Sequence, residues 1–227
     1  MRRFLLFFLC LVFLCPCGAS AAEKPKYIAL TFDGGPAEDH VRALLAGLAV
    51  RDARATFFLC GKQLEQNPEL AEKILAQGHE IGIQSYWGND FSGLSRRAIA
   101  AEISDTRALL PQRCPVRLLR PPGGRGSDGT NQVAKALGLA VADWALEPGD
   151  SALWDNSAVG RGILDQVRDG DVIRIRDLSA SSVSTALNLV SLLQKRGFTV
   201  VTMSELAQLR AVPLRPGQHY SSFPVQS

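Results

Sequence analysis

The sequence predicts an α/β fold. Short apolar runs, typical of buried parallel strands, alternate with amphipathic helical patterns from about residue 27 to residue 202. Several helical patterns have start or stop signals, such as Ser95 before an alanine-rich run and Gly78, Gly138 or Gly197 after one. The alternation runs through the chain without internal repeats. It therefore predicts parallel strands joined by right-handed helical crossovers.

The elements follow in order along the chain. Each strand is predicted from an apolar run that is too short for a helix, and each helix from an apolar periodicity between two such runs. The predicted strands are 27–32, 55–59, 80–84, 117–120, 139–144, 171–176 and 198–202. The predicted helices are about 38–50, 68–77, 95–110, 130–137, 158–168 and 180–196. Residues 211–227 contain three prolines and are expected to form an irregular tail over the surface.

The first 22 residues have the layout of a secretory signal peptide. Arg2 and Arg3 precede an apolar run from Phe4 to Cys15, and small residues follow at 19–21. The run is short for a membrane span. A lipid anchor at Cys17 is disfavoured because proline precedes this cysteine. The expected organisation is a signal peptide at 1–22, one domain at 23–210 and a tail at 211–227, in a protein that is secreted or periplasmic.

The charge of the chain is nearly balanced. The formal charge of +3 falls to +1 once Arg2 and Arg3 leave with the signal peptide. Nucleic-acid and membrane-surface proteins usually have a strong basic excess. The sequence therefore predicts no nucleic-acid partner and no membrane span after signal cleavage.

Residues 31–36 read Thr-Phe-Asp-Gly-Gly-Pro directly after an apolar run, residues 120–124 read Arg-Pro-Pro-Gly-Gly, and residues 147–150 read Glu-Pro-Gly-Asp. These motifs resemble the first, third and fourth signatures of the polysaccharide deacetylase (NodB-homology) family. The resemblance covers roughly residues 25–210. It implies a distorted (β/α) barrel with about seven parallel strands. Metal-dependent removal of N-acetyl groups from a polysaccharide is the activity that it implies.

The chain departs from the family where the metal would bind. The first signature has a second aspartate, here Gly34, and the second has two histidines, here Gln84 and Gly88. The fifth signature ends in Leu-x-His-Asp, and Arg176 takes the place of its catalytic histidine. The chain therefore resembles a degenerate member that lacks the metal ligands.

The histidines elsewhere in the chain do not supply the missing ligands. The whole sequence has three, His40 in a predicted helix, His79 at the start of a predicted strand, and His219 in the tail. Transition metals in proteins take several nitrogen, oxygen or sulfur ligands at fixed geometry. We expect no metal site of the family type and no cofactor.

The retained family positions and their neighbours form the predicted site. Sites of α/β barrels lie at the carboxyl ends of the strands, where several of these residues fall. Asp33, Arg120 and Asp150 are the candidate catalytic residues, with Asp150 expected to hold Arg120. The candidate ligand-binding residues are Gln84, Trp87, Trp154, Arg176 and Asp177.

Two arginines on the predicted strand 171–176 raise a further hypothesis. Arg174 and Arg176 alternate with isoleucines, so both are candidates for the barrel interior. A guanidinium that replaces the metal would pair with Asp33, and Arg176 at the strand end is the preferred candidate. The alternative for Arg174 is an outward position with its charge in water. Trp144 lies inside an apolar strand and is expected in the core.

Cys60 and Cys114 remain after signal cleavage. In a parallel barrel they would lie at opposite ends of their strands, which places them too far apart for a disulfide. Both are predicted to be free thiols.

Two classes of function stay open. The first is a metal-free pseudoenzyme that binds cell-envelope carbohydrate or a protein partner without turnover. The second is a hydrolase that removes N-acetyl groups from an envelope polysaccharide. The lost ligands favour the first, and the family resemblance favours the second.

Overall fold

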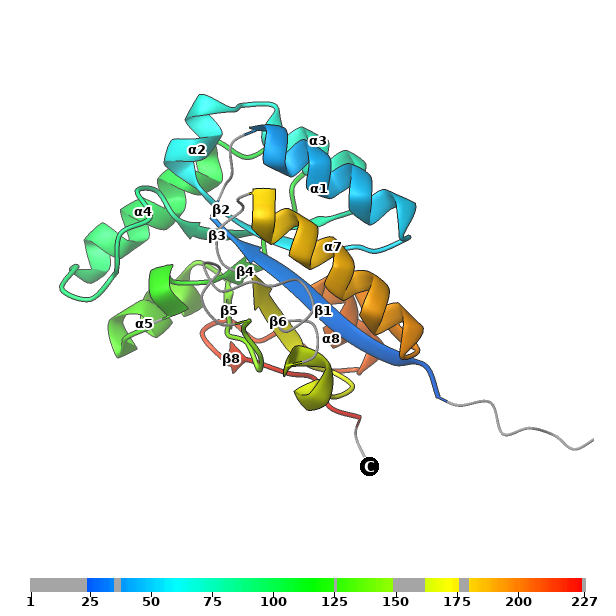
Figure 1. Cartoon of the computed structure of the whole chain (residues 1–227). Coiled ribbons are helices and arrows are strands. Elements are labelled where there is room, and N and C mark those ends of the chain that lie inside the picture. The colour runs from blue at the N-terminus through cyan, green and yellow to red at the C-terminus, as the bar shows by residue number, and fades with distance from the viewer. Residues whose placement is uncertain (1–23, 35–37, 125, 149–161, 176–179, 226–227) are drawn as a thin grey trace, which may run out of the picture.

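The computed structural model describes residues 24–34, 38–124, 126–148, 162–175 and 180–225. The predicted signal peptide lies outside this part of the chain. A curled sheet of parallel strands forms the centre, and helices cover it (Figure 1). The predicted α/β class and distorted barrel are confirmed.

The strands have the bounds that follow. They are β1 Lys26–Asp33, β2 Thr56–Cys60, β3 Glu80–Ser85, β4 Leu118–Leu119, β5 Ala140–Ala142, β6 Val172–Ile175, β7 Phe198–Val201 and β8 His219–Tyr220. The helices are α1 Glu38–Val50, α2 Gly61–Gln66, α3 Leu70–Ala76, α4 Arg96–Ala108, α5 Asp128–Ala136, α7 Ala180–Lys195 and α8 Met203–Leu209, with a 3₁₀ turn at Pro122–Gly124. Residues 162–166 are also helical, within the predicted helix 158–168.

The sheet curls until its two sides nearly meet. The strand order is β6-β1-β2-β3-β4-β5-β8, and β7 pairs with the first half of β1. Beyond β5 the chain bridges to β6 through Leu146 and Ile173, and Asp171 bridges to Ser222 after β8. The carboxyl ends of β1, β4, β5 and β6 therefore face a common space, which positions the site.

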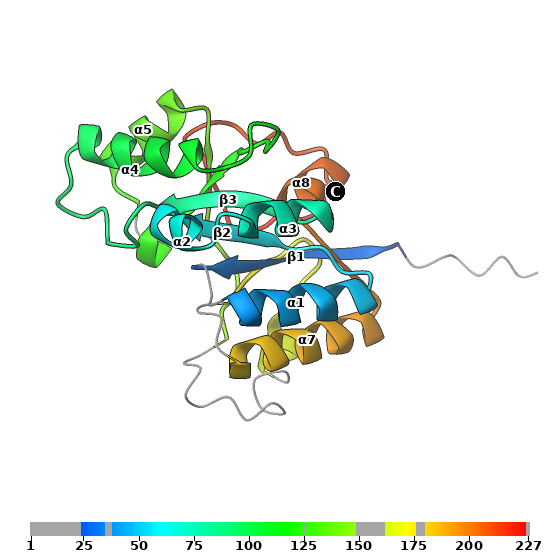
Figure 2. The ribbon, with the colours of Figure 1, turned by 90° about the horizontal axis from the view of Figure 1, so that it is seen from above.

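Helices on the outside complete the core. Figure 2 shows α1 and α7 side by side against one face of the sheet. Arg51 after α1 donates from Nε to the Ser191 hydroxyl of α7 at 2.8 Å, which joins the two helices. The strands are buried on both faces, as in other parallel sheets.

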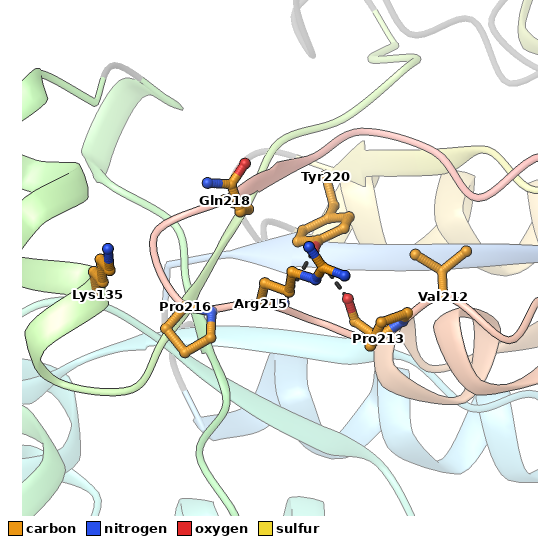
Figure 3. A pocket seen from close by; sticks show the side chains of 7 residues that line it. All are labelled: Lys135, Val212, Pro213, Arg215, Pro216, Gln218 and Tyr220. Carbon is orange, nitrogen blue, oxygen red and sulfur yellow. Dashed lines mark hydrogen bonds between the residues drawn. The ribbon is translucent and has the colours of Figure 1, made fainter.

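The described tail is mostly irregular, as expected, but it also forms one short strand. Its residues His219–Tyr220 form β8, which pairs in parallel with β5, and Phe223 is fully buried. Figure 3 shows the segment from Val212 to Tyr220 beside Lys135 of α5, where it lines an open cavity. The sequence did not predict this strand, because a strand of two residues among polar residues and prolines is too short to show a hydrophobic periodicity.

The two short helices α2 and α8 were also absent from the sequence prediction. They have six and seven residues, below the length at which an apolar periodicity is evident. Helix α8 nevertheless has a capping box, because the Thr202 side chain accepts from Glu205 N–H and the Glu205 side chain accepts from Thr202 N–H. Cys60 and Cys114 are both free, as predicted.

Candidate functional site

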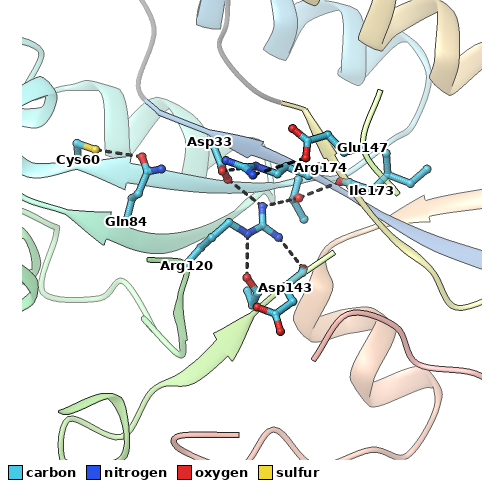
Figure 4. Close-up of polar contacts among 10 residues, drawn as sticks. Asp33, Cys60, Gln84, Arg120, Asp143, Glu147, Ile173 and Arg174 are labelled. Carbon is cyan, nitrogen blue, oxygen red and sulfur yellow. Dashed lines mark hydrogen bonds and ion pairs between the residues drawn. The ribbon is translucent and has the colours of Figure 1, made fainter. Parts of the chain in front are cut away.

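Asp33, the last residue of β1, is held by two buried arginines (Figure 4). Its Oδ1 lies 2.9 Å from Arg120 Nη1, and its Oδ2 lies 2.6 Å from Arg174 Nε. All three side chains are almost completely removed from solvent. Charged groups are tolerated at such depth when they are paired, so each ion here depends on the others.

Arg120 occupies the centre of this arrangement. It follows β4 directly and is fully buried. Its guanidinium also donates to the Thr31 hydroxyl at 2.7 Å and to the carbonyls of Ala142 and Asp143 at 3.0 Å each. It stacks on the Phe58 ring at 4.1 Å. Burial lowers the pKa of Arg120, whereas the Asp33 carboxylate raises it. The guanidinium remains charged at any ordinary pH.

Arg174 reaches Asp33 because of the register between β6 and β1. Thr31 is the partner of Arg174 in the sheet, and Asp33 lies two residues further along the same face of β1. Arg174 is only 3% exposed, so the alternative in which its charge lies in water is wrong. Its Nη1 lies 3.7 Å from Glu147 Oε2, and its guanidinium stacks on the Trp144 ring at 4.0 Å.

A guanidinium of this strand therefore does pair with Asp33, that of Arg174. Arg176, the preferred candidate, lies outside the described residues, as do Asp177, Asp150 and Trp154. The predicted pairing of Arg120 with Asp150 is for that reason untested. Arg174 falls where the family's fifth signature has its leucine, so an apolar position of the family now holds a charge.

The other positions at the rim offer little to a metal ion. Gly34 and Gly88 have φ of 77° and 83°, the left-handed conformation that favours glycine. Gln84 is buried, and its Oε1 accepts a hydrogen bond from the Cys60 thiol at 3.1 Å. Burial raises the pKa of that thiol, which opposes a thiolate ligand.

The donor set does not fit a divalent metal. Both oxygens of Asp33 are taken by arginines, and two positively charged groups stand within ion-pair distance. Among the described residues, no cluster of three His, Cys, Asp or Glu side chains could hold a metal ion. The described residues therefore include no set of ligands for the Lewis acid that the family resemblance implies.

Aromatic residues flank the site on two sides. Trp87 follows β3, is 58% exposed and makes edge contact with Tyr86 at 5.0 Å. Trp144, expected in the core, is half-buried and lines a cavity beside Asp143. The predicted strand extends to residue 144, but β5 ends at Ala142, so Trp144 lies two residues beyond the strand.

His79 and His219 lie away from Asp33. His79 Nδ1 accepts from the Ala55 N–H at 3.1 Å, and burial lowers the pKa of this histidine to about 4, aided by the Arg54 charge. His219 on β8 contacts Asp143 Oδ2 through Nδ1 at 2.9 Å and Asn131 Oδ1 through Nε2 at 2.8 Å. Sequence reasoning missed this cluster, because nothing in the order of residues links 131, 143 and 219.

The sequence profile described as "Polysaccharide deacetylase" matches residues 20–142, more than half of the chain. The resemblance of the separate motifs agrees with this match. The chain belongs to the polysaccharide deacetylase family.

Known proteins similar to the chain are deacetylases of cell-wall or related glycans. It is 29% identical to a peptidoglycan-N-acetylglucosamine deacetylase of Bacillus cereus, over 86% of this chain and 96% of that protein. It is also 29% identical to the peptidoglycan-N-acetylmuramic acid deacetylase PdaC of Bacillus subtilis, over 82% of this chain but 39% of that longer protein.

Solved structures agree in fold. A structure described as T48 deacetylase with substrate aligns with a TM-score of 0.78 and 28% identity, covering 87% of this chain and 97% of that one. A family 4 acetyl xylan esterase of Clostridium thermocellum, in complex with cobalt, aligns with a TM-score of 0.80 and 25% identity, over 88% of this chain and the whole of that one.

Proposed function

We propose that this protein is a metal-free, catalytically impaired polysaccharide deacetylase homologue that binds carbohydrate of the cell envelope. The observation that carries the proposal is the occupation of both Asp33 oxygens by Arg120 and Arg174. The carboxylate at this position acts as a base on metal-bound water in enzymes that the sequence resembles. In this chain the Asp33 carboxylate instead forms ion pairs with two buried arginines.

The chemistry argues against turnover in two ways. Free water has a pKa near 15.7 and is a poor nucleophile at neutral pH unless a metal lowers that pKa. A general base must also be free to accept a proton from the water. Asp33 makes its ion pairs at 2.9 and 2.6 Å and is 4% exposed, so accepting a proton would break buried contacts.

The balance of charge suggests the class of ligand. The described centre contains two guanidinium groups, Arg120 and Arg174, and two carboxylates, Asp33 and Glu147. These charges cancel, and the Asp143 carboxylate near Arg120 adds a further negative charge, so the described residues leave no net positive charge to attract a uronate, sulfate or phosphate group. A neutral sugar bound by hydrogen bonds and aromatic stacking fits this balance better.

Envelope carbohydrate is proposed because similar proteins are named for peptidoglycan and chitooligosaccharide substrates. A secreted or periplasmic location follows from the predicted signal peptide at 1–22, with the domain at 23–210. No helix in the described part of the chain has the length and apolar character of a membrane span. A protein partner is the alternative ligand if no glycan binds.

The competing proposal is an active N-deacetylase, which the names of the relatives favour. Purified protein lacking the signal peptide would be assayed for acetate release from chitooligosaccharides and peptidoglycan, with zinc, cobalt or manganese added. We expect background rates and substoichiometric metal by mass spectrometry. The Asp33→Asn variant is the matched control. Metal-dependent turnover that this substitution abolishes would establish the hydrolase instead.

A further inference from the structure

A cavity outside the arginine centre has the chemistry of a sugar site. It has a volume of 590 Å³ and is lined by Trp144, Asp143, His219 and the two glycines Gly124 and Gly126. We propose that this cavity binds one ring of a neutral glycan, which we call the tail-side sugar site. The proposal rests on the proposed carbohydrate-binding function and assigns the residues that perform it.

The aromatic wall is held in place from behind. Trp144 stacks with the Arg174 guanidinium at 4.0 Å, and the Arg120 guanidinium lies 5.6 Å from the same ring. A Cβ added at Gly124 would lie 2.0 Å from Trp144 Cη2, so the loop after β4 packs directly against the ring. A rigid aromatic ring costs little entropy when a ligand stacks on it.

The polar wall offers a carboxylate acceptor held by a histidine. Asp143 Oδ2 and His219 Nδ1 are 2.9 Å apart, and the two side chains are 32% and 37% exposed, so both remain accessible. His219 Nε2 is fixed by Asn131 at 2.8 Å. Carboxylate oxygens accept from sugar hydroxyls, and His219, with both ring nitrogens engaged by Asp143 and Asn131, holds the Asp143 carboxylate in place. The Asp143 carboxylate disfavours an anionic ligand at this wall.

The site depends on the tail and on the buried centre together. His219 belongs to β8, which pairs with β5, and Asp143 follows β5 directly. The Asp143 carbonyl also accepts from Arg120 Nη2 at 3.0 Å (Figure 4). The arginine centre thereby positions one wall of the cavity through the backbone, and the tail supplies the other.

The test measures glycan binding by calorimetry on the whole chain without its signal peptide. The probes are chitotriose, xylotriose and, as an anionic comparison, trigalacturonate. Gly126→Leu should fill the cavity, because a Cβ at this position lies 3.4 Å from Asn131 Oδ1 and 3.5 Å from His219 Cε1. Gly129→Leu is the matched control, since its Cβ has contacts of 3.4 and 3.5 Å away from the cavity.

We expect Gly126→Leu to weaken neutral-trisaccharide binding at least tenfold and His219→Ala to weaken it about three- to tenfold, because Asp143 then loses the partner that holds its carboxylate towards the ligand. Gly129→Leu should bind like wild type. Circular dichroism verifies that each variant is folded. Unchanged binding by folded Gly126→Leu, or a loss with Trp87→Ala instead, overturns the tail-side sugar site and leaves the proposed function standing. Failure of the wild type to bind any probe overturns both.

Discussion

Replacing Arg174 tests whether a guanidinium really holds the centre together. We expect Arg174→Met to lower the free energy of unfolding by about 3–5 kcal/mol, the usual cost of removing one partner of a buried ion pair. The lower part of that range is expected, because Asp33 keeps its ion pair with Arg120 at 2.9 Å after the substitution. Arg174 and Asp33 side chains are 4% and 5% exposed with 2.6 Å between Nε and Oδ2, and the stack on Trp144 is lost as well.

Urea denaturation followed by circular dichroism provides the measurement. The exposed pair Lys73–Glu69, with side chains 41% and 81% exposed, is the matched control. Lys73→Met should change stability by no more than about 1 kcal/mol, because surface ion pairs contribute little. Both variants remove one positive charge from an ion pair, so the difference between their free energies of unfolding reports the effect of burial.

A double-mutant cycle makes the test specific. Asp33→Asn removes the carboxylate, so Arg174→Met should cost clearly less in that background than in the wild type. Equal costs in both backgrounds would refute the reasoning, because the two side chains would then act independently. A loss below about 1 kcal/mol for Arg174→Met alone would also refute it, since the buried Asp33 would not need this partner.

Three further outcomes are expected. Burial holds the pKa of His79 at about 4 in the folded state, below its unfolded value. The unfolded chain therefore binds more protons between about pH 6.5 and 4, and the free energy of unfolding should fall as the pH drops through that window. Urea titrations of His79→Gln should show a flatter dependence of stability on pH, and a dependence identical to that of the wild type would contradict the assignment. Phe223→Ala should cost about 3–5 kcal/mol, because the ring is fully buried; a loss below about 1 kcal/mol would mean that the tail is dispensable. The triple variant Gly34→Asp, Gln84→His and Gly88→His restores the family's metal ligands. We expect calorimetry to detect zinc or cobalt binding only when Arg174→Leu is added to it. Tight metal binding by the triple variant alone would contradict the role given to Arg174.

Most of the fold could be predicted from the sequence because its elements have strong periodicity. Helix α1 has the predicted bounds, and the long strands and helices differ from prediction by a few residues. The misses are α2, α8 and β8. The pairing of β8 with β5 is a tertiary contact that no local pattern records, whereas α8 has a local signal in its Thr202–Glu205 capping box.

The candidate site could be predicted only in part. Motif order identified Asp33 and Arg120, and the structure brings these two together at 2.9 Å. The choice between Arg174 and Arg176 could not be settled from alternation, since alternation predicts both on the same face of a strand. The register of β6 against β1 decides which of them is level with Thr31, and register is a property of pairing rather than of one strand.

The buried centre gives a physical reason why Asp33 and Arg120 are present in a chain that has other residues at the family's metal-ligand positions. Arg120 has no exposed surface, and removing Asp33 would leave two buried guanidinium groups without the carboxylate that contacts both of them. A single substitution at Asp33 or Arg120 is therefore penalised whether or not the site catalyses anything. Gly34, Gln84 and Gly88 belong to no such network of charges. Retention of the Asp33–Arg120 pair is thus evidence about stability, and the positions around it carry the evidence about function.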